Sequence, residues 1–193
     1  MDRFERAKLA FDQLNALDPV TETVDGNPQP RLVVQADRLS RWVERLEPNA
    51  SEALRLAARC QHVERWKIPR DDFPPGRVGY LQWRTKLARF HADRAEGVLR
   101  GAGYEDDVVH AVRRIVTKQN LHSNPDSQTM EDALCLVFLE FELDAFIAKY
   151  PDQDKAVEIL EKTWKKMSPR GRDAALALPL APAARRLVEA ALA

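Results

Sequence analysis

Residues 130–150 read MEDALCLVFLEFELDAFIAKY, and this stretch decides the fold class. Ten of the sixteen residues from Thr129 to Asp144 are apolar, which predicts a helix that other elements surround on nearly every side. Pro151 follows directly and predicts the end of this helix, because proline lacks the backbone N–H that a helix interior requires. A helix of this kind needs amphipathic helices around it, and the rest of the chain supplies them.

Apolar residues recur at every third or fourth position along most of the remaining sequence, which is the period of an α-helix with one buried face. Proline-rich stretches between these segments, such as residues 18–30 and 67–77, are predicted to be loops. The sequence therefore predicts an all-α fold of eight or nine helices, arranged as a single domain over residues 1–193. The expected helices cover residues 4–14, 32–46, 49–66, 78–100, 105–116, 129–150, 153–166, 168–178 and 182–192.

The composition argues against several classes of protein. The 193 residues include 30 Lys or Arg and 30 Asp or Glu, and this net charge of zero argues against bulk coating of nucleic acid or membrane. No run of about 18 apolar residues is present, and the N-terminal segment lacks the apolar core of a signal peptide. Cys60 and Cys135 have no CxxC partner, so neither a disulfide framework nor a cysteine zinc site is expected. These features predict a cytoplasmic protein with no membrane partner.

Charge is distributed unevenly along this neutral chain. Residues 59–94 carry nine Lys or Arg and four Asp or Glu, whereas residues 105–161 carry thirteen acidic and five basic residues. Five of the fourteen aromatic residues also fall within the basic segment. Arginine offers paired N–H donors to anionic oxygens and aromatic rings offer stacking surfaces, so this pattern favours a pocket for a phosphate-bearing, nucleotide-like small molecule. The alternative is a set of solvated helix faces whose cations form ion pairs with the acidic segment.

Helical spacing sorts the basic segment into two faces. His62, Arg65 and Trp66 are spaced i, i+3 and i+4 at the end of the third predicted helix. Four residues share a face of the long helix that follows, namely Tyr80, Arg84, Leu87 and His91. We expect the two helices to be neighbours with His62 and His91 on facing surfaces; the alternative is that each is a core histidine with its hydrogen bonds satisfied. The predicted ligand-binding residues are His62, Arg65, Trp66, Tyr80, Trp83, Arg84, Lys86 and His91.

Carboxylates on the apolar stretch are the natural counterparts of these cations. Among the acidic residues of the stretch are Glu131, Asp132, Glu140 and Asp144. An acidic side chain is costly to bury unless it is paired or bound to a metal ion. The carboxylates therefore predict either ion pairs with the basic segment or a general base or metal ligand, and Asp132 and Glu140 are the candidate acidic partners.

Four strings within these segments resemble a known family. They are EALRLAARCQHVERWKIPR (52–70), GYLQWRTKLARFHADRAEGVLRGAGY (79–104), TMEDALCLVFLE (129–140) and KTWKKMSP (162–169). They resemble a bacterial and fungal family defined by a domain of unknown function, DUF4202, and the likeness spans almost the whole chain. This resemblance implies no activity that transfers to individual residues.

The string AARCQH (57–62) is also similar to the helix that supplies His-Asp to a divalent metal in HD-domain phosphohydrolases. In that alignment Gln61 stands in place of the ligand His and His62 in place of the Asp. No histidine lies at residues 35–37, where the resemblance places another ligand, and Glu140 is a loose substitute for the last Asp. Because glutamine is a poor metal ligand, we expect an HD-like topology without a tightly bound divalent metal ion.

The leading hypothesis is an HD-like all-α protein that binds a phosphate-bearing small molecule and, in a further step, hydrolyses it. A rival hypothesis is a non-enzymatic adaptor that binds protein or structured RNA through a helical surface, and a third is a structural domain without a ligand. The sequence contains no GxGxxG, GxxxxGK[ST], HExxH or GxSxG motif, so it indicates no particular cofactor. A concave site that gathers His62, Arg84 and His91 favours the ligand hypothesis, whereas a flat basic face favours the adaptor.

Overall fold

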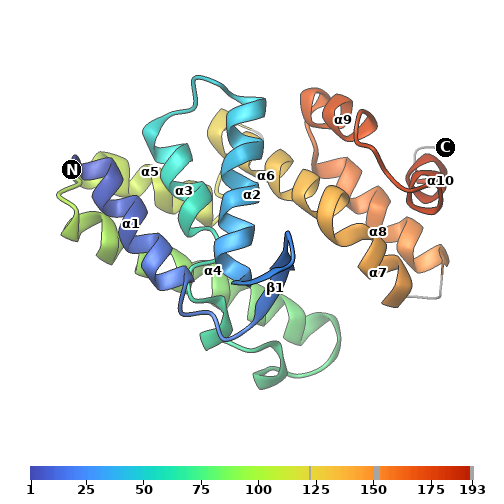
Figure 1. Ribbon diagram of the computed structural model, residues 1–193, viewed down its shortest axis with the longest axis horizontal. Helices are drawn as coiled ribbons and strands as arrows, with labels where there is room; N and C mark the ends of the chain where they lie inside the picture. Colours follow the sequence, from blue (N-terminus) through green and yellow to red (C-terminus); the bar gives the residue numbers. More distant parts are fainter. Residues whose placement is uncertain (122, 150–152, 192–193) are drawn as a thin grey trace.

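The computed structural model of the chain describes residues 1–121, 123–149 and 153–191. Within these ranges the protein has ten α-helices, a two-stranded sheet, two 3₁₀ turns and one π-helical turn (Figure 1). The predicted all-α class is confirmed, and the helix count exceeds the predicted eight or nine because the apolar stretch contains two helices instead of one. The α-helices are α1 (Arg3–Asn15), α2 (Arg31–Leu46), α3 (Glu52–Cys60), α4 (Gly76–Gly101), α5 (Asp106–Val116), α6 (Pro125–Val137), α7 (Leu143–Lys149), α8 (Gln153–Lys166), α9 (Pro169–Leu176) and α10 (Pro182–Ala190).

Helix α6 lies at the centre of the molecule, as its apolar sequence predicts (Figure 1). It packs against α2, α3, α5, α8 and α9, and Met130, Ala133 and Leu136 are completely buried. The helix begins four residues earlier than predicted, at Pro125, because the side chain of Asn124 accepts a hydrogen bond from the backbone N–H of Ser127. The central helix thus has a polar N-cap, and its apolar residues are buried by the surrounding helices.

A π-helical turn, η3 (Phe138–Glu142), interrupts the apolar stretch and separates α6 from α7. The sequence instead predicts one helix from residue 129 to residue 150, the last of which lies outside the described residues. Single π turns inside helices occur frequently at functional sites, because the extra residue per turn redirects the neighbouring side chains. Here Phe138 and Glu142 both line the cavity described below.

The other helices form two groups on either side of α6. On one side α3 packs against α1, α2 and α5, and α4 packs against α5 and α1; on the other, α10 packs against α7 and α8, and α9 packs against α6 (Figure 1). One hydrophobic cluster runs through both groups, from Phe11 in α1 to Val188 in α10. Among the described residues, no helix is both long enough and apolar enough to cross a membrane.

The segment 18–30, which the prolines predict to be a loop, contains a hairpin of β1 (Thr21–Val24) and β2 (Asn27–Pro30). The strands are antiparallel and Val24 pairs with Asn27, so only Asp25 and Gly26 form the turn. Both turn residues have positive φ, which is the geometry that Asp-Gly favours in two-residue hairpin turns. The Asp-Gly pair is a sequence signal for a hairpin, but the neighbouring prolines favour a loop, so the hairpin was not predicted.

Helix α3 ends at Cys60, six residues before the predicted end at Trp66. The chain turns sharply because Glu64 adopts a left-handed backbone with φ +52°, after which η1 (Arg65–Lys67) forms one 3₁₀ turn. The buried carboxylate of Glu64 forms ion pairs with Lys67 and with Arg94 of α4. This contact across thirty residues fixes the turn, so local spacing does not reveal it. A second 3₁₀ turn, η2 (Arg70–Asp72), precedes α4.

Candidate functional site

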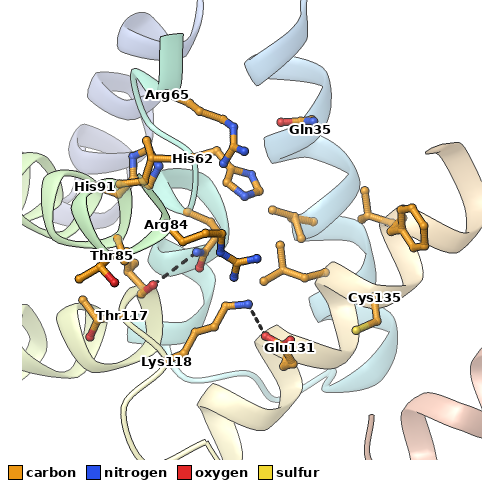
Figure 2. A pocket seen from close by; sticks show the side chains of 18 of the residues that line it. Gln35, His62, Arg65, Arg84, Thr85, His91, Thr117, Lys118, Glu131 and Cys135 are labelled. Atoms are coloured by element: carbon orange, nitrogen blue, oxygen red, sulfur yellow. Dashed lines mark hydrogen bonds and ion pairs between the residues drawn. The ribbon is translucent and has the colours of Figure 1, made fainter. Parts of the chain in front are cut away.

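A cavity of about 900 Å³ opens between α2, α4, α5, α6 and α8. Its lining residues include six Lys or Arg and three Asp or Glu, so the described part of the wall carries an excess of positive charge. In Figure 2 the side chains of His62, Arg65 and Arg84 extend toward the centre of the cavity, while Gln35 of α2 and Glu131 of α6 lie opposite. The site is therefore concave and its two walls come from distant parts of the sequence.

Helix α4 contributes the face that its spacing predicts. All four residues of that face line the cavity, namely Tyr80, Arg84, Leu87 and His91. Trp83 also lines it, and its Nε1 donates a hydrogen bond of 3.0 Å to the backbone oxygen of Ile68. This bond ties the loop between α3 and α4 to the helix and fixes the orientation of the indole ring.

The segment after α3 brings His62 and Arg65 to the same cavity, although neither residue lies on an α-helix. The imidazole rings of His62 and His91 meet edge to face, with centroids 6.2 Å apart, as expected from the sequence. The guanidinium of Arg65 lies over the ring of Trp83, 4.8 Å from its centroid. Trp66, predicted to share this face, is half-buried outside the cavity lining because the turn at Glu64 replaces the helix.

Two of the arginines in this wall lack a carboxylate partner. Neither Arg65 nor Arg84 forms an ion pair with any residue that the structure describes, and Arg84 Nη1 instead donates to the Tyr80 hydroxyl at 3.1 Å. Burial, together with the positive charge of Arg84, lowers the pKa of Arg65 below its usual range. The two guanidinium groups thus repel one another, and the Glu142 carboxylate of the same cavity attracts Arg65 without forming an ion pair with it.

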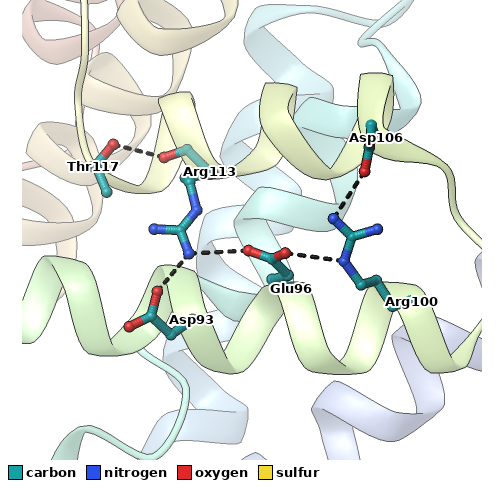
Figure 3. Close-up of polar contacts among 6 residues, drawn as sticks. All are labelled: Asp93, Glu96, Arg100, Asp106, Arg113 and Thr117. Carbon is teal, nitrogen blue, oxygen red and sulfur yellow. Dashed lines mark hydrogen bonds and ion pairs between the residues drawn. The ribbon is translucent and has the colours of Figure 1, made fainter.

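Three other cations of the same cavity, Arg113, Lys118 and Lys166, form ion pairs. Figure 3 shows Arg113 of α5 between two acids of α4, where it forms ion pairs with Asp93 and, at 3.0 Å, with Glu96. Glu131 is buried and forms ion pairs with Lys118 and, at 3.9 Å, with Lys166. Pairing of this kind neutralises one part of the wall and leaves Arg65, Arg84 and the exposed Arg89 without ion pairs among the described residues.

The two histidines are neutral near pH 7. Burial lowers the pKa of His91 to about 4, and the Nδ1–H of this ring donates to the Val63 carbonyl oxygen at 2.8 Å. Burial, and then the charge of Arg65, lowers the pKa of His62 well below 6.5. Among the described residues, His62 Nδ1 and His91 Nε2 are buried without a hydrogen-bond partner. The rings therefore add polar atoms to the site without adding charge.

The remaining sequence candidates lie outside the cavity lining. Lys86 is exposed, with its ammonium 5.8 Å from the centroid of the Phe73 ring, because it lies two positions from Arg84 and points to another face of α4. Glu140 accepts a hydrogen bond of 2.7 Å from Trp42 Nε1. Its position therefore serves the packing of η3 on α2 instead of the cations.

Asp132, the other candidate acid, holds the start of α9. Its carboxylate accepts hydrogen bonds from the backbone N–H and hydroxyl of Ser168, at 2.8 and 2.5 Å, and from Gln128 Nε2 at 3.1 Å. Gly171 lies against it so closely that an added Cβ would be 2.6 Å from the carboxyl carbon. Asp132 is thus a buried structural carboxylate whose partners lie away from the cavity.

A family model described as a domain of unknown function (DUF4202) matches residues 5–188. The chain belongs to this family. Comparison with curated proteins and with solved structures finds no match. The more distant likeness to HD-domain phosphohydrolases therefore stays a prediction, and no group of three or more His, Cys, Asp or Glu among the described residues is arranged to hold a metal ion.

The wall of the DUF4202 cavity formed by α2, α6 and α8 was not predicted from the sequence. Gln35 donates to Glu142 at 3.4 Å, and the Cys135 thiol points to the backbone oxygen of Thr163 at 3.9 Å. Lys118 follows α5 in a left-handed conformation with φ +57°, which turns the chain toward α6. The local sequence predicts burial of Cys135 but no cavity position for it, and it does not assign Gln35 or Lys118 to this wall, because only helix packing places these residues opposite α4.

Proposed function

We propose that this DUF4202 protein binds a phosphate-bearing small molecule of nucleotide size in the cavity between α2, α4, α5, α6 and α8. The observation that carries the proposal is the convergence of Arg65 and Arg84 on this cavity without carboxylate partners among the described residues. A phosphate group accepts paired hydrogen bonds from a guanidinium and relieves the repulsion between the two arginines. A ligand with less negative charge would relieve less of it.

The surroundings of the arginines support an oriented site. Stacking on Trp83 holds the plane of the Arg65 guanidinium, and the Tyr80 hydroxyl holds Arg84. The neutral imidazole of His62 can donate one N–H to a phosphate oxygen while its other nitrogen remains an acceptor. Such preorganised donors bind an anion with little further loss of side-chain entropy.

The shape of the site favours a small ligand over the adaptor hypothesis. Arg65, Arg84, His62 and His91 line one concavity instead of spreading over a flat face. A concave arrangement of this kind favours a ligand pocket over a flat binding face. Hydrolysis of the bound phosphate remains a prediction of the HD resemblance.

Thermal unfolding with inorganic phosphate tests the proposal. At about 100 times its dissociation constant, phosphate stabilises a one-site protein by about 2.7 kcal/mol, which for this chain length raises the Tm by roughly 5–10 °C. We expect R65Q and R84Q to lose most of this rise, whereas R186Q, which removes an exposed arginine on α10, retains it. Sodium chloride of equal ionic strength serves as the blank. Equal phosphate responses in all four proteins would overturn the proposal.

A further inference from the structure

The cavity is much larger than a phosphate group. Its volume of about 900 Å³ falls in the range of pockets that enclose whole drug-sized ligands, roughly 300–1,000 Å³. Arg65, Arg84 and His62 occupy only the wall next to α4, so a bound phosphate would leave most of the space open. The rest of the ligand must therefore match the wall formed by α2, α6, η3 and α8.

That opposite wall carries apolar side chains beside polar ones such as Gln35, Thr163 and Lys166. Leu134 of α6, Phe138 of η3 and Ile159 of α8 line the cavity and are each partly exposed, and Leu39 of α2 lies beside them. The ring of Phe138 is held edge to face against that of Phe146, with centroids 5.5 Å apart. Partly exposed apolar side chains inside a concave site gain free energy when a ligand covers them, in proportion to the apolar area removed from water.

The two carboxylates of this wall already have partners, and Glu142 accepts a hydrogen bond of 3.4 Å from Gln35. Glu131 already has Lys118 and Lys166 as ion-pair partners. A ligand therefore gains nothing from a second charge there, and hydroxyl groups placed against Leu134 and Ile159 would lose their hydrogen bonds to water.

We infer that the ligand is a phosphate monoester with an apolar, carbon-rich body, whose phosphate lies at Arg65 and Arg84 and whose body covers Leu134, Phe138 and Ile159. This inference rests on the proposed phosphate site and adds the chemical class of the remainder of the ligand. The inference predicts that aryl or alkyl phosphates bind more tightly than inorganic phosphate and than polyhydroxylated sugar phosphates.

Titration calorimetry with three probes at equal ionic strength tests the class. We expect phenyl phosphate to bind at least tenfold more tightly than inorganic phosphate, because its ring covers the apolar wall, and ribose 5-phosphate to bind within threefold of inorganic phosphate. Similar affinities for phenyl phosphate and inorganic phosphate, or tighter binding of ribose 5-phosphate than of phenyl phosphate, would overturn the inference and leave the phosphate site standing. Absence of binding by all three probes would overturn the phosphate site as well.

Substitutions in the apolar wall test whether Leu134 and Ile159 cause the preference for phenyl phosphate over inorganic phosphate. We expect L134Q and I159T to reduce the preference for phenyl phosphate over inorganic phosphate at least threefold, with the affinity for inorganic phosphate unchanged within twofold. The matched control is L187Q, since Leu187 is a half-buried leucine of α10 outside the cavity lining. An unchanged preference in both wall variants, with the fold verified by circular dichroism, would place the organic body elsewhere and overturn the assignment.

Discussion

Two arginines of the same cavity, Arg113 and Arg84, differ in what surrounds their charge. Arg113 forms ion pairs with Asp93 and Glu96, and Glu96 in turn pairs with Arg100, which also binds Asp106 (Figure 3). Arg84 has the hydroxyl of Tyr80 and the guanidinium of Arg65 as its neighbours. The difference teaches that the fold neutralises its positive charges in one part of the cavity and keeps them available in another.

A third arginine shows how this fold treats a cation that it buries for structure alone. Arg59 is 6% exposed and binds two carboxylates, with Nε 2.9 Å from Asp12 and Nη1 2.5 Å from Asp37. Its backbone oxygen accepts a hydrogen bond from the buried side chain of Asn15. At Arg59 the chain thus supplies full compensation, whereas Arg65 and Arg84 have no ion pair among the described residues, and the proposed ligand site rests on this difference.

The largest effect is expected at Arg59. We predict that R59M lowers the free energy of unfolding by about 3 kcal/mol, because it leaves Asp12 and Asp37 close together without their shared cation. The matched substitution R65M should change it by less than about 1 kcal/mol, since methionine preserves the packing and removes an unpaired charge. Urea denaturation measures both. A larger loss in R65M than in R59M would contradict the distinction between structural and ligand-binding arginines.

A smaller loss is expected at Asp132. We predict that D132A destabilises the protein by about 2 kcal/mol, because Ser168 and Gln128 lose the buried acceptor that organises the start of α9. The phosphate-induced rise in Tm should persist in this variant, since the carboxylate lies outside the cavity lining. Loss of the phosphate response in a folded D132A protein would return Asp132 to the binding site.

Acidification is expected to lower the free energy of unfolding, because the buried His91 is neutral in the folded protein. The unfolded chain takes up a proton near pH 6.5 while the folded chain does so only near pH 4, so the free energy of unfolding decreases as the pH falls through this window. Between pH 7 and pH 5 this histidine should contribute a loss of about 2 kcal/mol. Urea denaturation of wild type and H91Q at both pH values isolates the contribution. Parallel losses in the two proteins would show that His91 titrates normally.

The parts of this molecule that follow from the sequence are those set by local periodicity. The face of α4 with Tyr80, Arg84 and His91 follows from the helical period alone, and all three line the cavity. The apolar stretch likewise identifies α6 as the central helix, since a helix apolar on all sides must be surrounded.

The parts that do not follow depend on contacts between distant residues. The end of α3 is set by the ion pair of Glu64 with Arg94, and no pattern near Trp66 records it. The assignment of Asp132 to α9 depends on Ser168, thirty-six positions away. Sequence spacing can indicate that a carboxylate is buried, but the packing of distant segments determines which residue becomes its partner.

In the proposed site, unpaired arginines, and not arginines in general, bind the anion. The direct measurement is the Kd of inorganic phosphate for wild type, R84Q and R113Q by titration calorimetry at about 0.15 M ionic strength, where charges beyond roughly 8 Å are largely screened. We predict that R84Q raises the Kd at least tenfold and that R113Q changes it by less than threefold, because Asp93 and Glu96 already neutralise Arg113. Equal weakening by the two substitutions, or a wild-type protein that does not bind phosphate, would contradict the claim.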